Sequence, residues 1–296
     1  MHSQLKLSTP KLQSKTIMKI HKIEAETWRL DGGAMFGLVP KTIWSKQYPA
    51  DENNTLKMST RLMLIETDDG RNVLVDTGMG NKRGEKYYQY KYIVDYISLE
   101  DALKEAGFKT EEITDVVLTH LHDDHVGGAV RKNGAAYELV FPNATHWLSE
   151  AQFNWAVNPN KREAGTYFPD NFLPIQEAGK LELVKDNGEY IPGIEFRIYN
   201  GHTQGQMLPF VNIDGKTFVF MADFIPFVAS IPLPYVASVD VQPLITMEEK
   251  EAFLNEAADK NYFLFFEHDF HNEICTVEHN SKRVALKKRY QLSELV

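Results

Sequence analysis

Cysteine is almost absent from this sequence, and neither an excess of positive charge nor a long uninterrupted apolar segment is present. The single cysteine, Cys275, cannot form a disulfide within the chain, so the fold must be held by its core or by metal. Lys and Arg number 32 against 41 Asp and Glu, and the net charge of -9 argues against a nucleic-acid partner. With 296 residues, 43% of them hydrophobic, the chain is long enough to bury a sizeable core.

No segment has the composition of a membrane span or a signal peptide. The most apolar long stretch, residues 218–236, contains Asp223 and three prolines, which a membrane helix would have to accommodate. Residues 1–17 carry three lysines but no continuous apolar run. We therefore expect a cytoplasmic protein with no membrane partner, in which residues 1–17 form a flexible N-terminal arm and residues 18–296 a single domain.

Apolar patterns along the chain predict alternating strands and helices. Helices are expected near Ser98 and Thr246, where a capping residue precedes an apolar stripe. Residues 31–54 have neither a helical nor a strand period and are expected to form a long loop. The alternation predicts α/β or α+β layers around one core. The expected strands are residues 17–30, 61–66, 72–76, 115–119, 194–199, 217–221 and 262–266.

A cluster of metal-binding residue types follows the strand expected at residues 115–119. Residues 120–125, His-Leu-His-Asp-Asp-His, place three imidazoles close to a carboxylate. Imidazole and carboxylate suit Zn²⁺ and related divalent ions, and a cation relieves the crowding of such groups on one turn. Gly127 and Gly128 allow the tight backbone that such a loop needs. The alternative, that these are ordinary core or surface histidines, explains the cluster poorly.

This cluster resembles the HxHxDH motif of the metallo-β-lactamase superfamily, and three further segments match that family in order. Residues 201–206, Gly-His-Thr-Gln-Gly-Gln, resemble its GHTPGQ segment, with Gln204 in place of proline. Residues 221–223, Met-Ala-Asp, resemble its Gly-Asp, and residues 266–269, Phe-Glu-His-Asp, supply its last histidine. The resemblance implies a four-layer αββα sandwich.

The resemblance also implies a site with two divalent metal ions, most commonly Zn, with Mn, Co or Fe as alternatives. Their bridging hydroxide would attack the carbonyl of an ester, with Asp124 and Asp223 in the catalytic machinery. Asp76, at the end of a strand, is expected to orient a metal ligand, the alternative being an ordinary turn residue. One metal would be held by His120, His122 and His202, and the other by Asp124, His125 and His268, with Asp223 bridging the two.

Two further histidines are assigned outside this ligand set. His271 lies three residues after His268 and is the alternative for the last ligand, but His268 follows the apolar strand directly and is preferred. His146 lies within an apolar run and is expected to be a core histidine.

Features beyond the metal motifs narrow the function within the superfamily. Asp223 stands where the antibiotic-hydrolysing β-lactamases have a cysteine. Residues 31–44 resemble the N-terminal loop of quorum-quenching N-acyl-homoserine lactonases and of methyl-parathion-type phosphotriesterases. Many of these lactonases have a tyrosine three residues after the bridging aspartate, where this chain has Pro226, and Tyr235 is expected to substitute for it. A lactonase is therefore predicted, with a methyl-parathion-hydrolase-like phosphotriesterase or a non-catalytic metal-containing binding protein as alternatives.

The expected partners are a small apolar ester or lactone and a second copy of the chain. A homodimer would use residues 31–54, which are expected to expose Phe36, Trp44 and Tyr48. The basic run at residues 281–289 is interpreted as the solvated face of a C-terminal helix rather than as a nucleic-acid site. Some of seven apolar residues would line a pocket for an acyl chain, the others belonging to the core: Phe36, Leu38, Trp44, Trp155, Phe168, Phe224 and Phe227.

Overall fold

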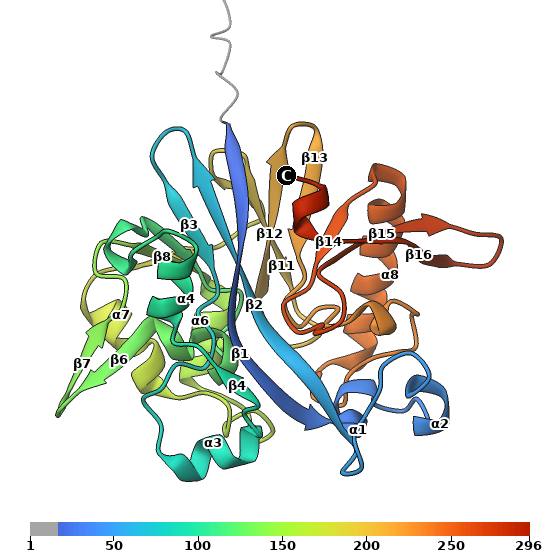
Figure 1. The fold of residues 1–296 in the computed structure, drawn as a ribbon, viewed down its shortest axis with the longest axis horizontal. Coiled ribbons are helices and arrows are strands. Elements are labelled where there is room, and N and C mark those ends of the chain that lie inside the picture. The colour runs from blue at the N-terminus through green and yellow to red at the C-terminus, as the bar shows by residue number, and fades with distance from the viewer. Residues whose placement is uncertain (1–16) are drawn as a thin grey trace, which may run out of the picture.

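In the computed structural model, which describes residues 17–296, two seven-stranded sheets lie face to face (Figure 1). The chain builds one sheet up to residue 184 and the other from residue 188 onward, as the colours of Figure 1 show. All but the last residue of the predicted N-terminal arm lies outside the described residues.

The hydrogen-bonded order of the strands shows which strand ends share an edge. Among the described strands, β3, β5, β8 and β9 run parallel to one another, as do β13 and β14, so the carboxyl ends within each set point the same way. In order, the first sheet contains β4 (Asp95–Tyr96), β1 (Met18–Asp31), β2 (Thr55–Thr67), β3 (Asn72–Val75), β5 (Asp115–Val117), β8 (Thr145–Ser149) and β9 (Leu181–Val184). The second contains β10 (Gly188–Ile191), β11 (Ile194–Tyr199), β12 (Gln206–Ile213), β13 (Lys216–Phe220), β14 (Phe263–Phe265), β15 (Ile274–His279) and β16 (Val284–Tyr290). A separate hairpin pairs β6 (Val130–Asn133) with β7 (Ala136–Leu139).

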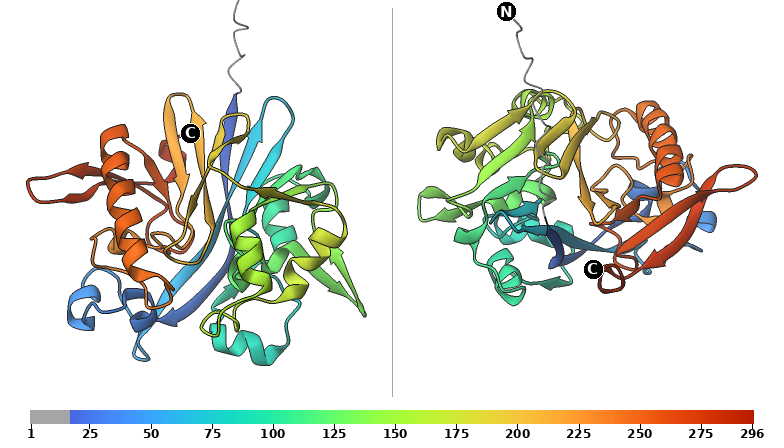
Figure 2. Two further views of the ribbon diagram at one scale, coloured as in Figure 1. Left: turned by 180° about the vertical axis from the view of Figure 1, so that it is seen from behind. Right: turned by 90° about the horizontal axis from the view of Figure 1, so that it is seen from above.

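Helices cover the outer faces of both sheets, which gives the predicted αββα sandwich (Figure 2). The helices α4 (Leu99–Glu105) and α6 (Glu150–Val157) pack on the first sheet, and α8 (Pro243–Lys260) packs on the second. No helix within residues 17–296 combines the length and the apolar character needed to cross a membrane. The remaining helices are α1 (Gly32–Phe36), α2 (Lys41–Trp44), α3 (Glu85–Lys91), α5 (Asp123–Val126) and α7 (Leu173–Glu177).

The central strand β2 shows why four layers form. Leu62, Met63, Leu64 and Ile65 are all fully buried. Side chains alternate between the two faces of a strand, so Leu62 and Leu64 pack toward the helices of the first sheet. Met63 and Ile65 pack against the second sheet. A strand that is buried on both faces requires a covering layer on each side.

The predicted elements are present with shifted ends. The seven expected strands correspond to β1, β2, β3, β5, β11, β13 and β14. The Ser98 hydroxyl accepts the N–H of Asp101 at 3.1 Å and caps α4, as its position in the sequence predicts. The helix near Thr246 begins earlier, at Pro243, because proline is well accommodated in the first turn of a helix.

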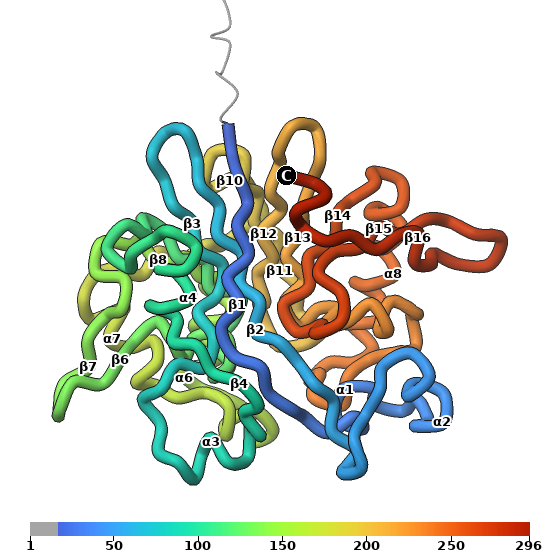
Figure 3. The backbone as a smooth tube through the Cα atoms, in the orientation of Figure 1, coloured from blue at the N-terminus to red at the C-terminus, as the bar shows by residue number. Residues whose placement is uncertain are grey.

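Residues 31–54 are not the long loop that the sequence predicts. They contain α1 and α2, which are too short for a helical period to be recognised. Phe36, Trp44 and Tyr48 are buried rather than exposed, and the rings of Phe36 and Trp44 stack with centroids 5.0 Å apart. In Figure 3 the segment lies on the side of the C-terminal half, and Phe36 packs against Phe227. The expected exposure of these rings was wrong, so the homodimer stays a prediction without that support.

The C-terminal basic run is a strand rather than the expected helix. Residues 284–289 of the run lie in β16, which is at the edge of the second sheet and pairs with β15. Lys287, Lys288 and Arg289 are exposed, so the basic face is solvated although its helical form was wrong. Basic side chains on an edge strand hinder its pairing with another chain.

Glu26 in β1 is a buried carboxyl with little compensation for its charge. Its Oε1 accepts the N–H of Met79 at 3.2 Å, and its Oε2 has no hydrogen-bond partner among the described residues. Burial raises the pKa of Glu26 from 4.5 to about 7.

We expect Glu26→Gln to flatten the pH dependence of the free energy of unfolding. A carboxyl with a raised pKa stabilises the folded state below pH 4.5 and loses that contribution as the pH rises to about 7. The shift corresponds to about 3 kcal/mol lost by the wild type over this range. Urea unfolding with a chelator present measures the difference. Glu182→Gln, which alters an exposed carboxyl of the same sheet, is the control, and parallel curves for the wild type and Glu26→Gln would contradict the prediction.

Candidate metal centre

Loops at one edge of the sandwich bring the predicted ligand residues together. Each loop follows a strand, and the strands are β5, β11, β13 and β14. The first group of side chains contains His120, His122, His202 and Asp223, and the second contains Asp124, His125 and His268. Within each group, one potential ligand atom per residue lies within 4.8 Å of the others. These groups correspond to the two ligand sets that the family resemblance implies.

The nitrogen atoms of the first group have the spacing of metal ligands. His122 Nδ1 lies 3.0 Å from His120 Nε2 and 3.1 Å from His202 Nε2. A tetrahedral zinc ion with bonds of about 2.0–2.1 Å places neighbouring nitrogen ligands about 3.3 Å apart. The three imidazoles therefore have room for one cation between them.

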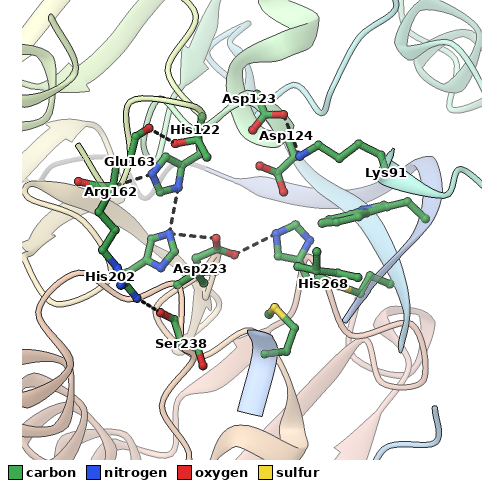
Figure 4. A pocket seen from close by; sticks show the side chains of 16 residues that line it. Lys91, His122, Asp123, Asp124, Arg162, Glu163, His202, Asp223, Ser238 and His268 are labelled. Atoms are coloured by element: carbon green, nitrogen blue, oxygen red, sulfur yellow. Dashed lines mark hydrogen bonds and ion pairs between the residues drawn. The ribbon is translucent and has the colours of Figure 1, made fainter. Parts of the chain in front are cut away.

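Asp223 is the side chain that contacts both groups (Figure 4). Its Oδ2 lies 3.1 Å from His202 Nε2, and its Oδ1 lies 2.9 Å from His268 Nε2. His268 Nε2 is in turn 3.2 Å from His125 Nε2. A carboxylate that directs one oxygen to each group has the geometry of a bridging ligand.

Each imidazole directs its other ring nitrogen to an acceptor outside the centre. His202 Nδ1 lies 2.9 Å from Asp240 Oδ1, and His125 Nδ1 lies 3.0 Å from Asp76 Oδ2. A neutral imidazole has one N–H, and donating it outward leaves a lone pair on the inner nitrogen. The other outer contacts join His122 Nε2 to Glu163 Oε1 (3.3 Å), His120 Nδ1 to Thr119 Oγ1 (3.0 Å) and His268 Nδ1 to the Ser59 carbonyl oxygen (3.0 Å).

Glu267 competes with Asp76 for His125. Its Oε2 lies 3.1 Å from the same Nδ1 atom. Burial raises the pKa of Glu267 to about 7, although His125 and His268 lower it. Glu267 therefore holds a proton more readily than an ordinary carboxyl.

These outer contacts determine what the centre can hold. Five imidazole nitrogens and the carboxylates of Asp124 and Asp223 converge in a largely buried space. Such groups repel one another at these distances unless cations lie between them. Imidazole nitrogen with carboxylate oxygen is a donor set that zinc and related divalent ions accept. The side chains therefore fit two divalent cations.

Burial and the neighbouring charges act differently on the imidazoles of the centre. Burial lowers the pKa of His120 well below its usual 6.5, and the neighbouring imidazoles lower it further. Burial acts in the same way on His202, but the carboxylates of Asp223 and Asp240 together outweigh it and raise the pKa of His202 to about 10. The surroundings of Asp223 therefore favour positive charge.

Two residues at the centre have left-handed backbone angles that non-glycine residues rarely adopt. Asp76 has a φ of 57°, and Ala222, next to Asp223, has a φ of 41°. The Asp76 carboxylate accepts the N–H and the hydroxyl of Thr119, both at 2.7 Å. It therefore joins the ends of β3 and β5 while it orients His125, and these contacts hold a conformation that would otherwise be unfavourable.

A cavity of about 340 Å³ opens beside the metal centre (Figure 4). Side chains of the predicted ligand set reach it, so a bound molecule would lie against the centre. The apolar part of its wall consists of Trp28, Leu30, Met35, Met58 and Val239, and the polar part includes Lys91, Asp123, Arg162, Glu163, Thr166 and Ser238. Such a wall suits a small molecule with one apolar portion.

The cavity wall differs from the one expected from the sequence. None of the seven apolar residues proposed above lines it. Phe36, Phe224 and Phe227 are buried in the core, whereas Leu38 is fully exposed. The true wall was missed because residues such as Trp28 lie in strands, where an apolar pattern indicates core packing.

The structure does not bring Tyr235 to the cavity. Its hydroxyl accepts a hydrogen bond from Gln47 Nε2 at 3.1 Å, and its ring packs against Phe36 with centroids 6.2 Å apart. The chain here runs toward α1, where the N–H of Ser238 donates to the Ala34 carbonyl oxygen at 2.7 Å. The expected substitution of Tyr235 for the missing tyrosine was therefore wrong.

His271 and His146 lie where the sequence analysis places them. His271 stays outside the two groups, and its ring packs on Tyr48 with centroids 4.9 Å apart. His146 is buried in β8, as expected of a core histidine. Glu163 and Asp240, which hold two of the imidazoles, were missed because they lie in loops that no motif marks.

We expect Asp240→Asn to weaken metal binding without unfolding the protein. The carboxylate favours the N–H on His202 Nδ1, and an amide holds that tautomer less firmly. Loss of such an outer contact lowers metal affinity by about 10- to 100-fold. Competition with a chromophoric chelator measures the zinc affinity.

Asp259→Asn is the matched control for this variant. It removes the carboxylate of an exposed pair, in which His279 Nε2 lies 2.8 Å from Asp259 Oδ1. Its zinc affinity should equal that of the wild type. Equal zinc affinities for Asp240→Asn and the wild type would show that the contact between Asp240 and His202 does not influence metal binding.

Comparisons with known proteins agree with this geometry. A family model described as the metallo-beta-lactamase superfamily matches residues 59–135. An N-acyl homoserine lactonase from Bacillus cereus is 24% identical over 241 residues, which are 74% of this chain and 85% of that protein. A solved structure from Staphylococcus aureus, described as a "probable metal-dependent hydrolase", is 28% identical with a TM-score of 0.83, over 94% of this chain and 100% of the other.

A second solved structure supports the same fold. The dizinc quorum-quenching lactonase AidC, in complex with a product, is 21% identical with a TM-score of 0.76, over 93% of this chain and 95% of the other. The family match, the sandwich and the ligand atoms at its edge lead to one assignment. The chain is similar to metal-dependent hydrolases of the metallo-β-lactamase superfamily, whose family model matches residues 59–135.

Proposed function

We propose that this chain is a lactonase that opens the ring of N-acyl homoserine lactones with two divalent metal ions, most commonly zinc. The observation that carries the proposal is an apolar cavity wall beside two ligand groups that share Asp223. The Bacillus cereus relative and AidC, both named as lactonases, support the substrate class.

The side chains of the centre have separate roles in this proposal. Bound there, two divalent ions supply a water molecule of lowered pKa and polarise the carbonyl oxygen of the substrate. Asp76, Glu163 and Asp240 keep imidazoles in the tautomer that presents a lone pair inward. The first ion would be held by His120, His122 and His202 and the second by Asp124, His125 and His268, and Asp223 lies against His202 of the first group and His268 of the second.

The apolar wall is the proposed site of the acyl chain. Trp28, Met35 and Met58 are buried in the protein and contribute to the wall. Each methylene group that leaves water contributes about 0.8 kcal/mol to binding. Affinity is therefore expected to rise with acyl length until the cavity of about 340 Å³ is filled.

Ring opening consumes one water molecule for each lactone. The oxygen of the water bonds to the carbonyl carbon, the ring C–O bond breaks, and the leaving oxygen takes up a proton to become a hydroxyl group. The new carboxylic acid ionises near neutral pH, so each turnover releases one proton. This proton is the signal for an assay.

We expect Asp223→Ala and His202→Ala each to lower the metal content and to reduce lactone hydrolysis by at least about 100-fold. The first variant lacks the carboxylate that contacts both groups, and the second lacks one imidazole of the first group. Elemental analysis gives the metal per chain, and proton release gives the hydrolysis of N-hexanoyl-homoserine lactone. His146→Ala alters a core histidine and is expected to lose stability while it keeps its metal.

Other outcomes of this experiment would contradict the assigned site or favour one of the alternative functions. Two metals and near-normal turnover in Asp223→Ala, or loss of metal in His146→Ala, would contradict the assigned site. Wild-type protein that hydrolyses a dialkyl aryl phosphate but no lactone would favour a phosphotriesterase. Wild-type protein with two metals and neither activity would favour a binding protein.

A further inference from the structure

Hydrolysis of an ester requires stabilisation of the negative charge that develops on a substrate oxygen. Tyr235 lies outside the cavity, so its hydroxyl is not the donor. Lys91 and Arg162 are the lysine and arginine side chains that line the cavity. They lie on opposite sides of Asp223 (Figure 4).

The ammonium group of Lys91 is held inside the cavity wall. Lys91 is the last residue of α3, and its side chain is 21% exposed. Its Nζ lies 2.8 Å from Asp123 Oδ2 and 5.6 Å from the ring centroids of both Trp28 and Tyr87. An ammonium has three N–H donors, and the pair with Asp123 uses one of them. The group therefore retains donors for a bound molecule.

The position of Lys91 is fixed through Asp123. The Tyr87 hydroxyl, from the same helix, donates to the Asp123 oxygen that pairs with Lys91. Asp123 is buried and directly precedes the ligand residue Asp124. Lys91 is thus anchored beside the second ligand group.

Arg162 is placed differently. It is exposed, and its guanidinium donates to the carbonyl oxygen of Ser238 at the rim of the cavity. A cation in contact with solvent is screened and stabilises charge less than one packed between aromatic rings. Of the two cations, Lys91 has the better position to act on a reacting oxygen.

We propose that Lys91 is a catalytic residue whose ammonium group donates a hydrogen bond to the ester oxygen on which negative charge develops, at the side of the cavity next to Asp124. This inference rests on the proposed lactonase function. Lys91 forms no covalent bond and keeps its protons, so its effect is electrostatic. Asp123 and Tyr87 are positioning residues, because they act through Lys91.

The test compares four variants by metal content, kcat and KM with N-hexanoyl-homoserine lactone. Lys91→Met should keep two metals per chain and lose about 100-fold in kcat, the usual cost of removing one such donor. Lys91→Arg, which restores a cation, should recover at least about tenfold of that loss. Tyr87→Phe leaves Lys91 in place and should lose less than about tenfold. Lys86→Met alters an exposed lysine of the same helix and should match the wild type.

Binding of the product provides a readout without turnover. Calorimetric titration of the metal-loaded protein with N-hexanoyl-homoserine, which carries a carboxylate, should show a Kd about tenfold weaker in Lys91→Met than in the wild type, as expected for the loss of one charge-assisted hydrogen bond. Unchanged product binding would overturn the proposal, because a donor to the reacting oxygen should also contact the carboxylate.

Three kinetic results would also overturn it. A kcat of Lys91→Met within about twofold of the wild type would show that the ammonium does not act on the reaction. Equal losses in Lys91→Met and Tyr87→Phe would show that Lys91 acts only by holding Asp123. Loss of metal in Lys91→Met would show that Lys91 helps to maintain the metal centre and does not act on the substrate. Failure of the wild type to open any lactone would instead reject the proposed function.

Discussion

Lone pairs on five imidazoles, all directed into one buried space around Asp223, are the constraint on which the rest of this structure depends. Each imidazole has given its N–H to an acceptor behind it, as His202 does to Asp240 and His125 to Asp76. In the neutral imidazoles that metal binding requires, the inner nitrogens cannot then relieve one another by hydrogen bonding. Divalent cations complete this arrangement, which explains why it is built from nitrogen and carboxylate oxygen and not from apolar side chains.

The sandwich provides the rigidity that such a centre needs. The ligand residues follow β5, β11, β13 and β14, so both sheets contribute to the centre. The outer acceptors come from still other segments, among them the Ser59 carbonyl oxygen in β2 and the loop residue Asp240. Because each imidazole is fixed from behind, its inner nitrogen is placed before any metal binds. The left-handed backbone of Asp76 is held by the contacts of its carboxylate with Thr119.

The sequence predicts the parts of the site that depend on local chemistry. Residues 120–125 concentrate imidazoles and carboxylates beyond what core packing explains, and His268 follows a strand in a way that separates it from His271. Residues such as Lys91 and Glu163 carry no local signal. They reach the centre only because α3 and a distant loop fold over it, and one sequence does not encode that proximity in any short pattern.

The misread elements have physical reasons as well. The helices α1 and α2 have five and four residues, which is close to a single turn and too short for an apolar stripe to repeat. The aromatic rings around them were expected to be exposed, although Phe36 and Trp44 stack inside a third apolar cluster. In the basic run at the C-terminus, pairing with β15 fixes a strand where charge patterning alone suggested a helix.

Diffraction from crystals of the zinc-loaded protein, recorded on both sides of the zinc absorption edge, tests the central claim most directly. The account predicts two anomalous peaks about 3.5–4 Å apart, with the Asp223 carboxylate in contact with both. One peak should lie among His120, His122 and His202, and the other among Asp124, His125 and His268. A single peak, or a peak between Asp76 and Glu267 behind His125, would contradict it.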